Sequence, residues 1–216
     1  MAFILDQHNS LANTFISELR DNSIQKDSMR FRRNLERIGE VLAYEISKTL
    51  NYKTTNVETP MGIAEMNLPD DRVVLATIMR AGLPMHQGFL NYFDQSENAF
   101  LSAYRKHHKD GTFEIKLDYI SCPNLDNCHL IVVDPMLATG ASMNIGIKAL
   151  LEHGTPKQLH IASVVCSTYG YEYLKRLYPE AKFWLAAIDE ELTARSYIVP
   201  GLGDAGDLAF GTKLQD

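Results

Sequence analysis

Residues 132–142 contain the side chains whose types and spacing best suit chemistry on a small ligand. An apolar run ends at Asp134, and small residues around Gly140 lead into a stretch with helical periodicity. Small residues let successive backbone N–H groups point toward one position, and the N-terminus of a helix adds positive potential there. Thr139 and Ser142 offer hydroxyl donors, and the Asp134 carboxylate can accept hydrogen bonds from neutral hydroxyls. This pattern suits a ligand with a phosphate at one end and sugar hydroxyls at the other, such as ribose 5-phosphate.

Two other interpretations of this loop are open on spacing alone. A nucleoside triphosphate loop would have the pattern GxxxxGK followed by serine or threonine, and no lysine follows Gly140 in this chain. The missing lysine argues against a kinase. An ordinary strand-to-helix turn that is rich in small residues would have the same composition, so spacing alone does not separate a ligand site from such a turn.

Arg80 offers the planar, paired donors that suit a diphosphate. Arg80 follows the apolar run 73–78, and small residues after it allow close approach of the backbone. Arg105 opens a basic stretch that is predicted to be a hairpin arm, with solvated histidines at its tip. For this segment alone, a salt bridge at the end of a strand would be the favoured explanation of Arg80.

Residues 197–212 are rich in main-chain donors and acceptors that no bulky side chain covers. Four glycines lie within the eleven residues 201–211, a density that favours loop over helix or strand. A flexible tail is the simplest interpretation of this composition. The apolar residues Ile198, Val199 and Phe210 instead indicate a loop that is anchored on the core.

These segments resemble, in the same order, the motifs of the uracil phosphoribosyltransferase family, and the resemblance covers nearly the whole chain. The chain reads Arg-Ala-Gly-Leu from Arg80, Tyr-Arg ending at Arg105, and Asp-Pro-Met-Leu-Ala-Thr-Gly-Ala-Ser from Asp134. From Gly201 it reads Gly-Leu-Gly-Asp-Ala-Gly-Asp, with Phe-Gly-Thr shortly after, and this match is the most specific.

One position departs from the family pattern. Family members usually carry two glycines before the serine, whereas this chain has Gly140 followed by Ala141. The additional methyl group is compatible with the site if Ala141 does not need a positive φ. The single carboxylate of Asp134, preceded by Val133, is similar to the uracil-specific branch.

The resemblance implies that uracil displaces diphosphate from C1 of 5-phosphoribosyl diphosphate (PRPP), giving UMP. Its implied catalytic residues are Asp204, Arg105 and Arg80. Its implied PRPP-binding residues are Arg80, Arg105, Asp134, Pro135, Met136, Leu137, Ala138, Thr139, Gly140, Ala141, Ser142 and Asp204. Its implied uracil-binding residues are Tyr197, Ile198, Gly203, Asp204 and Ala205.

A glycine-rich loop exposes the backbone groups that uracil recognition requires. The N3–H of uracil is a donor between two carbonyl acceptors, and a backbone C=O with neighbouring N–H groups matches it. Cytosine presents the opposite polarity at N3 and at its 4-amino group. A buried mismatch of this kind costs ~1–3 kcal/mol per unpaired group, so main-chain contacts are expected to separate the two pyrimidines.

The resemblance also implies partners and a cofactor. Magnesium is expected to arrive on PRPP, with no protein ligands assigned to it. The family forms dimers and larger assemblies, and some bacterial members respond to GTP, so a homodimer or larger homo-oligomer and a GTP effector are expected candidates. Two alternatives share the fold, namely a phosphoribosyltransferase for another base and a pyrimidine-responsive RNA-binding regulator.

Composition excludes several other classes. The formal charge of −6 argues against a nucleic-acid surface, which is normally basic. No apolar run approaches the ~20 residues that cross a bilayer, and the first ten residues lack the features of a secretory signal. The three cysteines have no metal-ligand spacing, and Cys166 is expected to be buried. A cytoplasmic, reducing location without membrane or nucleic-acid partners is therefore expected.

Alternating strands and helices must position these residues. Periodicity predicts helices at 29–50, 84–93, 143–153 and 171–178, the first capped by Asp27 or Ser28 and the third closed by Gly154. Apolar runs predict strands at 73–78, 99–104, 112–120, 130–133, 159–166 and 183–188. A short hairpin is predicted at 55–66. The basic residues on the first helix are Arg30, Arg32, Arg33 and Arg37, and a solvated face is expected for them, with a subunit or effector contact as the alternative.

This order predicts an α/β fold with a mainly parallel sheet flanked by helices, which is the type I phosphoribosyltransferase fold that the resemblance implies. A β-hairpin arm and a C-terminal base-binding hood are expected to protrude from it. We expect one domain over residues 1–216, with a core at about 68–190 and a hood from the N-terminal segment and residues 191–216. Ligands in such sheets bind at the carboxyl ends of strands, so chemistry is expected after Ile78, Val133 and Ile188.

Overall fold

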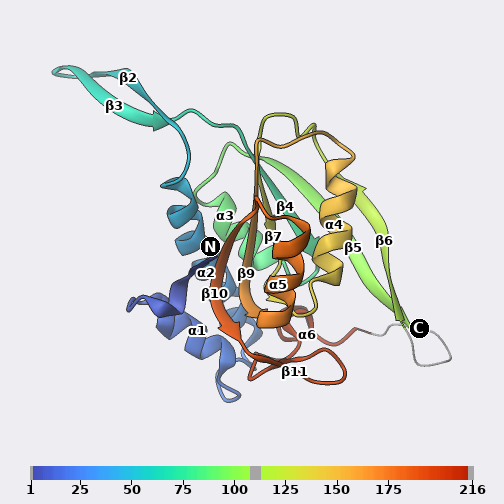
Figure 1. Ribbon diagram of the computed structural model, residues 1–216. Coiled ribbons are helices and arrows are strands. Elements are labelled where there is room, and N and C mark those ends of the chain that lie inside the picture. Colours follow the sequence, from blue (N-terminus) through green and yellow to red (C-terminus); the bar gives the residue numbers. More distant parts are fainter. Residues whose placement is uncertain (1, 108–112, 214–216) are drawn as a thin grey trace.

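A twisted sheet with helices on both faces forms the body of the molecule (Figure 1). The structure is a computed structural model that describes residues 2–107 and 113–213, without the side chains of residues 103–116. In spatial order the main strands are β1 (Ala2–Ile4), β10 (Lys182–Asp189), β9 (Gln158–Ser167), β7 (His129–Val133), β4 (Val73–Met79), β5 (Glu97–His107) and β6 (Phe113–Ser121). Neighbouring strands along this path are parallel except β5 and β6, which confirms the predicted mainly parallel sheet.

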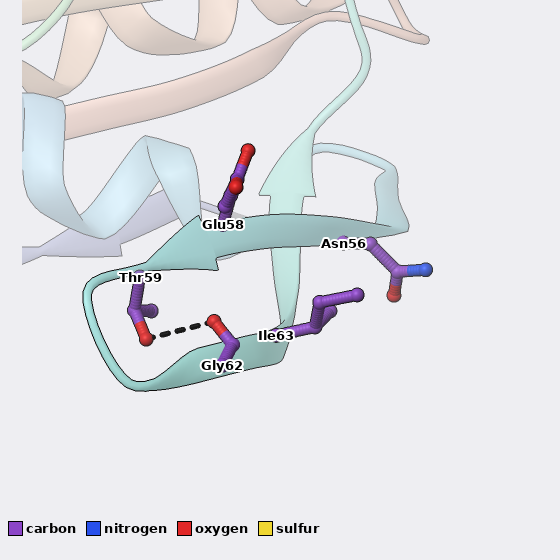
Figure 2. A pocket seen from close by; sticks show the side chains of 5 residues that line it. All are labelled: Asn56, Glu58, Thr59, Gly62 and Ile63. Atoms are coloured by element: carbon purple, nitrogen blue, oxygen red, sulfur yellow. Dashed lines mark hydrogen bonds between the residues drawn. The ribbon is translucent and has the colours of Figure 1, made fainter.

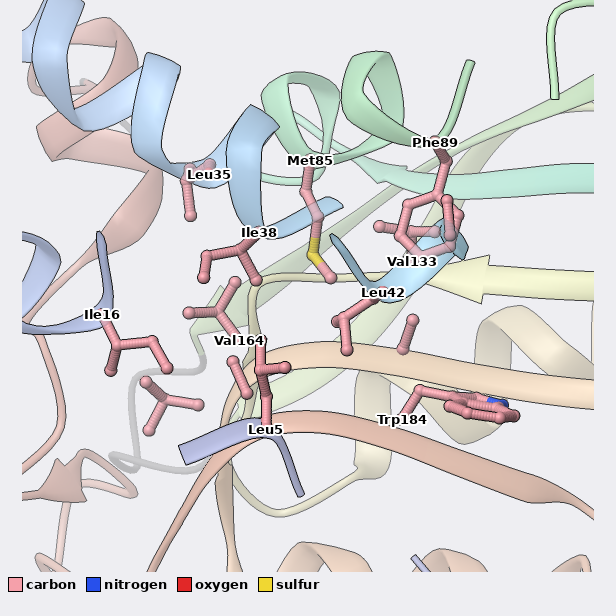
Figure 3. Close-up of a cluster of buried hydrophobic side chains, with 14 of the residues drawn as sticks. Leu5, Ile16, Leu35, Ile38, Leu42, Met85, Phe89, Val133, Val164 and Trp184 are labelled. Carbon is pink, nitrogen blue, oxygen red and sulfur yellow. The ribbon is translucent and has the colours of Figure 1, made fainter. Parts of the chain in front are cut away.

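The central strands alternate their side chains between two hydrophobic layers. Along β4, Leu75 packs with helices α1 (Ala12–Arg20), α2 (Ser28–Ser47) and α3 (Leu83–Leu90). Its neighbours Val74 and Ala76 pack on the opposite face with α4 (Ala141–Leu151) and α5 (Thr168–Leu177). This alternation explains why β4 is a continuous apolar run, because both of its faces are covered. Figure 3 shows the first layer, where Ile38 and Leu42 of α2 face the side chains of the sheet.

Helix α2 forms as its apolar periodicity predicts. The Asp27 side chain accepts hydrogen bonds from the backbone N–H of Met29 and Arg30, which caps the helix start. The predicted apolar stripe from Phe31 to Ile46 is buried. Three of the four basic residues make pairs on this helix or with α1: Arg30 with Glu18, Arg33 with Glu36, and Arg37 with Asn34. The fourth, Arg32, reaches the C-terminal segment instead.

Two hairpins extend from the body. Strands β2 (Tyr52–Thr59) and β3 (Gly62–Pro69) form the first, which is longer than predicted and projects away from the sheet (Figure 1). Strands β5 and β6 form the second, as predicted for the arm, with a register shift between Ser102 and Ala103.

Some predictions about the ends of the chain were wrong. Residues 201–211 were expected to be loop, but α6 (Ala205–Phe210) forms within them, because Asp204 caps it and contacts with α2 stabilise it. The predicted end of a central helix was also wrong: α4 ends at Leu151 with Glu152 at its C-cap, so Gly154 lies beyond the cap and does not close the helix. The first residues form β1 and α1, neither of which the sequence predicted. Over residues 2–107 and 113–213, no helix combines the length and apolar character needed to cross a membrane.

A line of buried polar side chains links β7, β9 and β10. The Nε1 of Trp184 donates to Nδ1 of His160 at 3.0 Å, and His160 Nε2 lies 3.1 Å from His129 Nδ1. His129 Nε2 in turn lies 3.3 Å from the carboxylate of Asp71, which also pairs with Lys157. Because an indole N–H only donates, His160 must accept at Nδ1, so this network requires a neutral imidazole. Burial lowers the pKa of His160 to about 3.

The stability of the fold should therefore fall in acid. The unfolded chain binds a proton at an ordinary histidine pKa of about 6.5, so protonation below that pH favours unfolding until the folded-state pKa is reached. From about pH 7.5 to about pH 5 we expect His160 to remove roughly 2 kcal/mol from the free energy of unfolding. Urea titrations followed by the fluorescence of the single tryptophan, Trp184, measure this change. The variant His160→Gln should lose that part of the pH dependence; an identical dependence would show that other groups cause it.

Candidate active site

The strand order reverses between β4 and β7, and this switch point places two predicted loops side by side. The chain passes from β4 through α3 to β5 on one side, and from β7 through α4 to β9 on the other. In open α/β sheets, ligands bind at the carboxyl ends of the strands at such a point. The loop after β4 touches the end of β7: Thr77 Oγ1 lies 3.4 Å from Val133 O, and a methyl group on Gly82 would lie 3.1 Å from the same oxygen.

The loop after β7 leads into the N-terminus of α4. Gly140 is the N-cap residue with φ of +78°, a conformation that favours glycine, and α4 begins at Ala141. Ala141 is therefore helical and does not need a positive φ, so the departure from two glycines causes no backbone strain. The Ala141 N–H donates to Thr139 Oγ1 at 3.3 Å. The first N–H groups of an α-helix have no partner within the helix, so the start of α4 can bind an anion.

Strand β9 and the start of helix α5 contact the loop between β7 and α4. Met136 and Leu137 form the short strand β8 (Met136–Leu137), which pairs with β9. The hydroxyl of Ser167, at the end of β9, donates to Ala138 O and accepts from the N–H of Gly170. A methyl group on Gly170 would lie 2.4 Å from Ala138 O, so glycine permits this close contact. The loop backbone is thus fixed independently of any ligand.

Asp134 begins the loop at the end of β7. Its Oδ1 accepts a hydrogen bond from the Met136 N–H at 3.2 Å. Protein atoms surround the carboxyl group closely, although part of the residue stays accessible to solvent, and this desolvation raises the pKa of Asp134 to about 7. A carboxyl group with this pKa changes charge near neutral pH, so its ability to accept hydrogen bonds from hydroxyls depends on pH.

Arg80 connects the β4 loop with the C-terminal segment. Its Nη2 lies 3.4 Å from Asp207 Oδ1 and 3.3 Å from Gly211 O, and its side chain is 40% exposed. Arg80 thus makes a salt bridge with Asp207, which was the alternative interpretation of this arginine. The contact is long, and in the described contacts only Nη2 of the guanidinium donates, so an incoming diphosphate can compete for this side chain.

The C-terminal segment begins with a short antiparallel pair and continues into α6. Strand β12 (Ile198–Val199) pairs with β11 (Glu191–Leu192). Gly203 has φ of +92° and precedes Asp204, whose Oδ1 accepts from the Asp207 N–H at 3.0 Å and caps α6. Side chains of Ile198, Leu202 and Ala205 are buried, as expected for an anchored loop rather than a flexible tail, whereas Tyr197 is exposed.

Neighbouring strand ends hold the two loops at one edge of the sheet. Ser167 and Asp189 are register partners at the ends of β9 and β10. Ser167 holds Ala138 of the loop from Asp134 to Ser142, which we call the phosphate-type loop, and Asp189 accepts from the Gly201 N–H at 2.8 Å. Thr139 lies in the phosphate-type loop, and Ala205 begins α6 in the C-terminal segment. Both segments are therefore fixed at the carboxyl ends of neighbouring strands. Arg80, after β4, also contacts the C-terminal segment.

Sequence reasoning missed Asp189, Asp207 and Arg20. The end of β10 was marked as a place for chemistry, so the signal for Asp189 was present, but its partner Arg20 lies in a helix that was not predicted. Arg105 lies in β5 opposite Ile115, and its side chain belongs to the part outside the described residues. The histidine tip that was expected to be solvated also lies there.

A separate hollow lies on the β2–β3 hairpin, where Asn56, Glu58, Thr59, Gly62 and Ile63 line it (Figure 2). Thr59 Oγ1 donates to Gly62 O at 2.8 Å across the turn. This hollow is remote from the switch point (Figure 1). Its lining carries a carboxylate and no cationic side chain, so it does not suit a phosphorylated ligand.

Helix-start amides, a carboxylate beside them, a guanidinium and a glycine-rich segment can together bind a sugar phosphate, a diphosphate and a flat polar ring. The observed fold is the mainly parallel α/β fold, with helices on both faces of the sheet, that was predicted for a type I phosphoribosyltransferase.

Comparison with known proteins identifies the branch. The family model described as uracil phosphoribosyltransferase matches residues 6–212. A uracil phosphoribosyltransferase from Porphyromonas gingivalis is 54% identical over 211 residues, which cover 97% of this chain and 98% of that protein. One from Thermococcus gammatolerans is 38% identical over 203 residues, covering 93% and 89%. A solved structure from Aquifex aeolicus covers 100% of both chains with a TM-score of 0.87 and 26% identity. The chain belongs to the uracil phosphoribosyltransferase family.

Proposed function

We propose that this chain transfers the 5-phosphoribosyl group of PRPP to uracil, giving UMP and diphosphate, as a step of pyrimidine salvage. The observation that carries the proposal is the meeting of the phosphate-type loop, the Arg80 loop and the glycine-rich C-terminal segment at one edge of the sheet. Family membership supports uracil as the base over a purine and over an RNA-binding role.

In this proposal the loop from Asp134 to Ser142 binds the ribose 5-phosphate part of PRPP. Backbone N–H groups of residues 139–142 donate to the phosphate, with help from the Thr139 and Ser142 hydroxyls. The Asp134 carboxylate accepts hydrogen bonds from the ribose hydroxyls. The intervening residues Pro135, Met136, Leu137 and Ala138 shape the loop, whose backbone β9 already holds in place.

The C-terminal segment binds uracil through its main chain. Backbone groups of Ile198, Gly203 and Ala205 meet the donor and acceptors of the ring, and Tyr197 borders the pocket. The buried side chains of Ile198 and Ala205 support this role, because they anchor the backbone of the segment on the core.

The reaction forms a bond between N1 of uracil and C1 of the ribose while the bond from C1 to the diphosphate oxygen breaks. The electron pair of that bond leaves with the diphosphate, and the N1 proton passes to water. Arg80 and Arg105 stabilise the charge on the leaving group. Asp204 orients a water molecule or the base near the reacting ribose.

The residues present fit a magnesium ion that arrives with the substrate. Within the described part of the chain, no group of three or more His, Cys, Asp and Glu side chains could hold a metal alone. Magnesium commonly binds substrate phosphates and water, with one or two carboxylates, and Asp134 stands beside the proposed ribose site. When bound, the ion neutralises charge on the diphosphate.

PRPP use should depend on pH through Asp134. Since its pKa is about 7, the carboxylate should be protonated progressively below neutral pH and accept ribose hydrogen bonds less well. We expect kcat/KM for PRPP to fall up to roughly tenfold from about pH 8 to about pH 6. The variant Asp134→Asn should have a lower kcat/KM for PRPP, and that value should not change with pH over this range. A wild-type profile without this decline would remove Asp134 from PRPP binding.

The exposed hairpin supports a homo-oligomer. Met61 is 97% and Ile63 73% exposed, and a lone two-stranded hairpin is marginally stable in water. We expect a second copy of the chain to cover it. Sedimentation should show a dimer or larger assembly that Ile63→Asp shifts toward monomer, whereas Leu11→Asp, at an exposed leucine on another face, should not. A monomeric wild type would contradict this assembly.

A direct assay tests the activity. UMP formation is followed with PRPP and uracil, cytosine or hypoxanthine, with and without magnesium and with and without GTP. We expect uracil to be used and magnesium to be required; GTP stimulation would identify it as an effector. A preference for hypoxanthine, or no UMP at all, would contradict the proposal.

The three cysteines are free thiols, and Cys166 is buried as expected. This cysteine usage supports a reducing, cytoplasmic location.

A further inference from the structure

The turn before the proposed base-binding residues is held by an ion pair from the other end of the chain. Arg20, the last residue of α1, donates to both carboxylate oxygens of Asp189 at 2.8 and 2.9 Å. The same guanidinium donates to Gly201 O at 3.1 Å, and Asp189 accepts from Gly201 N at 2.8 Å. Both backbone polar groups of Gly201 are therefore bound by this pair.

Gly201 determines how the segment turns from Ile198 toward Gly203. It has φ of +60°, and a methyl group there would lie 2.2 Å from Ile198 O. The turn is therefore too tight for a side chain, and the direction of the Ile198 carbonyl depends on its shape. Asp189 is 6% exposed, so its pairing with Arg20 is well shielded from solvent.

One further contact links an N-terminal helix to the same segment. Gln25, between α1 and α2, donates to Arg20 O at 3.0 Å and stays beside Gly203, where its Oε1 would lie 3.8 Å from an added methyl group. At the far end, Arg32 Nη1 donates to Ala209 O at 2.7 Å, which satisfies a carbonyl in the last turn of α6. The segment is thus fixed by α1 at its start and by α2 at its end.

The phosphate-type loop has a different support. Its backbone is held by Ser167 and by the pairing of β8 with β9, and neither contact involves Arg20 or Asp189. Loss of the Arg20 contacts should consequently disturb the C-terminal segment and leave the phosphate-type loop in place.

We infer that Arg20 is a positioning residue for the base: through Asp189 and Gly201 it sets the backbone that reads uracil. This inference rests on the proposed function. Arg20 does not touch the substrates in this scheme, and it acts by fixing the orientation of main-chain donors and acceptors. Because a main-chain site separates pyrimidines by hydrogen-bond polarity, a loosened turn should weaken uracil binding and the discrimination against cytosine together.

Steady-state kinetics of the full chain test this inference, with uracil and PRPP varied separately. Arg20→Met should raise KM for uracil by roughly tenfold or more, leave KM for PRPP within about twofold, and narrow the preference for uracil over cytosine. Arg20→Lys should recover part of the loss, because it keeps the charge without the paired donors. If Arg20→Met is not recovered folded, Asp189→Asn serves instead, since it removes the ion pair and keeps an acceptor for the Gly201 N–H.

Arg30→Met is the matched control. Arg30 also pairs with a carboxylate on α1, because its Nη1 lies 3.1 Å from both oxygens of Glu18, and it does not reach the C-terminal segment in the described contacts. Its KM for uracil should match the wild type. An unchanged KM for uracil in Arg20→Met, or equal increases of KM for uracil and PRPP, would overturn the inference. A wild-type chain that forms no UMP would instead overturn the proposed function, so the two failures are distinct.

Discussion

Replacing Arg80 with methionine should reduce kcat/KM for PRPP by roughly 10²- to 10³-fold. The guanidinium follows β4 at the switch point and is 40% exposed, and in the proposed reaction it binds the diphosphate as charge builds on it. Methionine keeps much of the length of the side chain and removes the charge and the paired donors. The loss should appear mainly in kcat/KM for PRPP, because uracil is bound by a different segment.

The same strand provides the control. Arg72 precedes β4 as Arg80 follows it, and the two side chains are 37% and 40% exposed. Arg72 pairs with Glu97 at the opposite edge of the sheet. Arg72→Met should lower stability slightly, by about 0.5 kcal/mol or less, and leave the kinetics unchanged. Equal kinetic effects at both positions would mean that Arg80 acts through the fold.

Replacing Asp204 with asparagine should reduce kcat by roughly 10²-fold. In the structure Asp204 Oδ1 caps α6, and in the proposed reaction its charge acts near the ribose, so the two tasks are separable. Asparagine caps helices about as well as aspartate, so α6 should persist while the negative charge is lost. The chemical step should slow with little change in the melting temperature.

Asp27→Asn is the control, because it also replaces a capping aspartate with asparagine, at the start of a different helix. Asp27 caps α2 by accepting from two backbone N–H groups, and it lies outside the proposed site. Its variant should have wild-type kinetics. A parallel Asp204→Ala variant should lose both the cap and the charge. If Asp204→Asn keeps full activity and Asp204→Ala does not, then Asp204 is structural.

The strands and helices of the body could be predicted because their patterns are local. Strands buried on both faces, such as β4 and β7, are continuous apolar runs, and α2 shows its stripe and its cap in sequence. The short strand β1 has only three residues, too few for a periodic signal. The glycine count concealed α6, although Asp204 as a cap with Asp207 in the first turn was a sequence signal for a helix start.

The site could be predicted only where it is encoded in contiguous loops. The phosphate-type loop and the glycine-rich segment each have a recognisable composition, and the switch point follows from the order of elements. The pair of Arg20 with Asp189 joins positions 169 residues apart, and no local pattern reveals such a contact. The ion pair of Arg80 with Asp207 also joins residues that are far apart in the sequence. Contacts that hold loops in place come from tertiary packing.

The crystal structure of the chain with UMP would test most directly that one cleft holds both halves of the product. We expect the phosphate to accept hydrogen bonds from the backbone N–H groups of residues 139–142. We expect the uracil ring of the same molecule to contact the main chain of Ile198 and Ala205. A UMP molecule with its base away from the C-terminal segment, or with its phosphate away from the start of α4, would contradict this site.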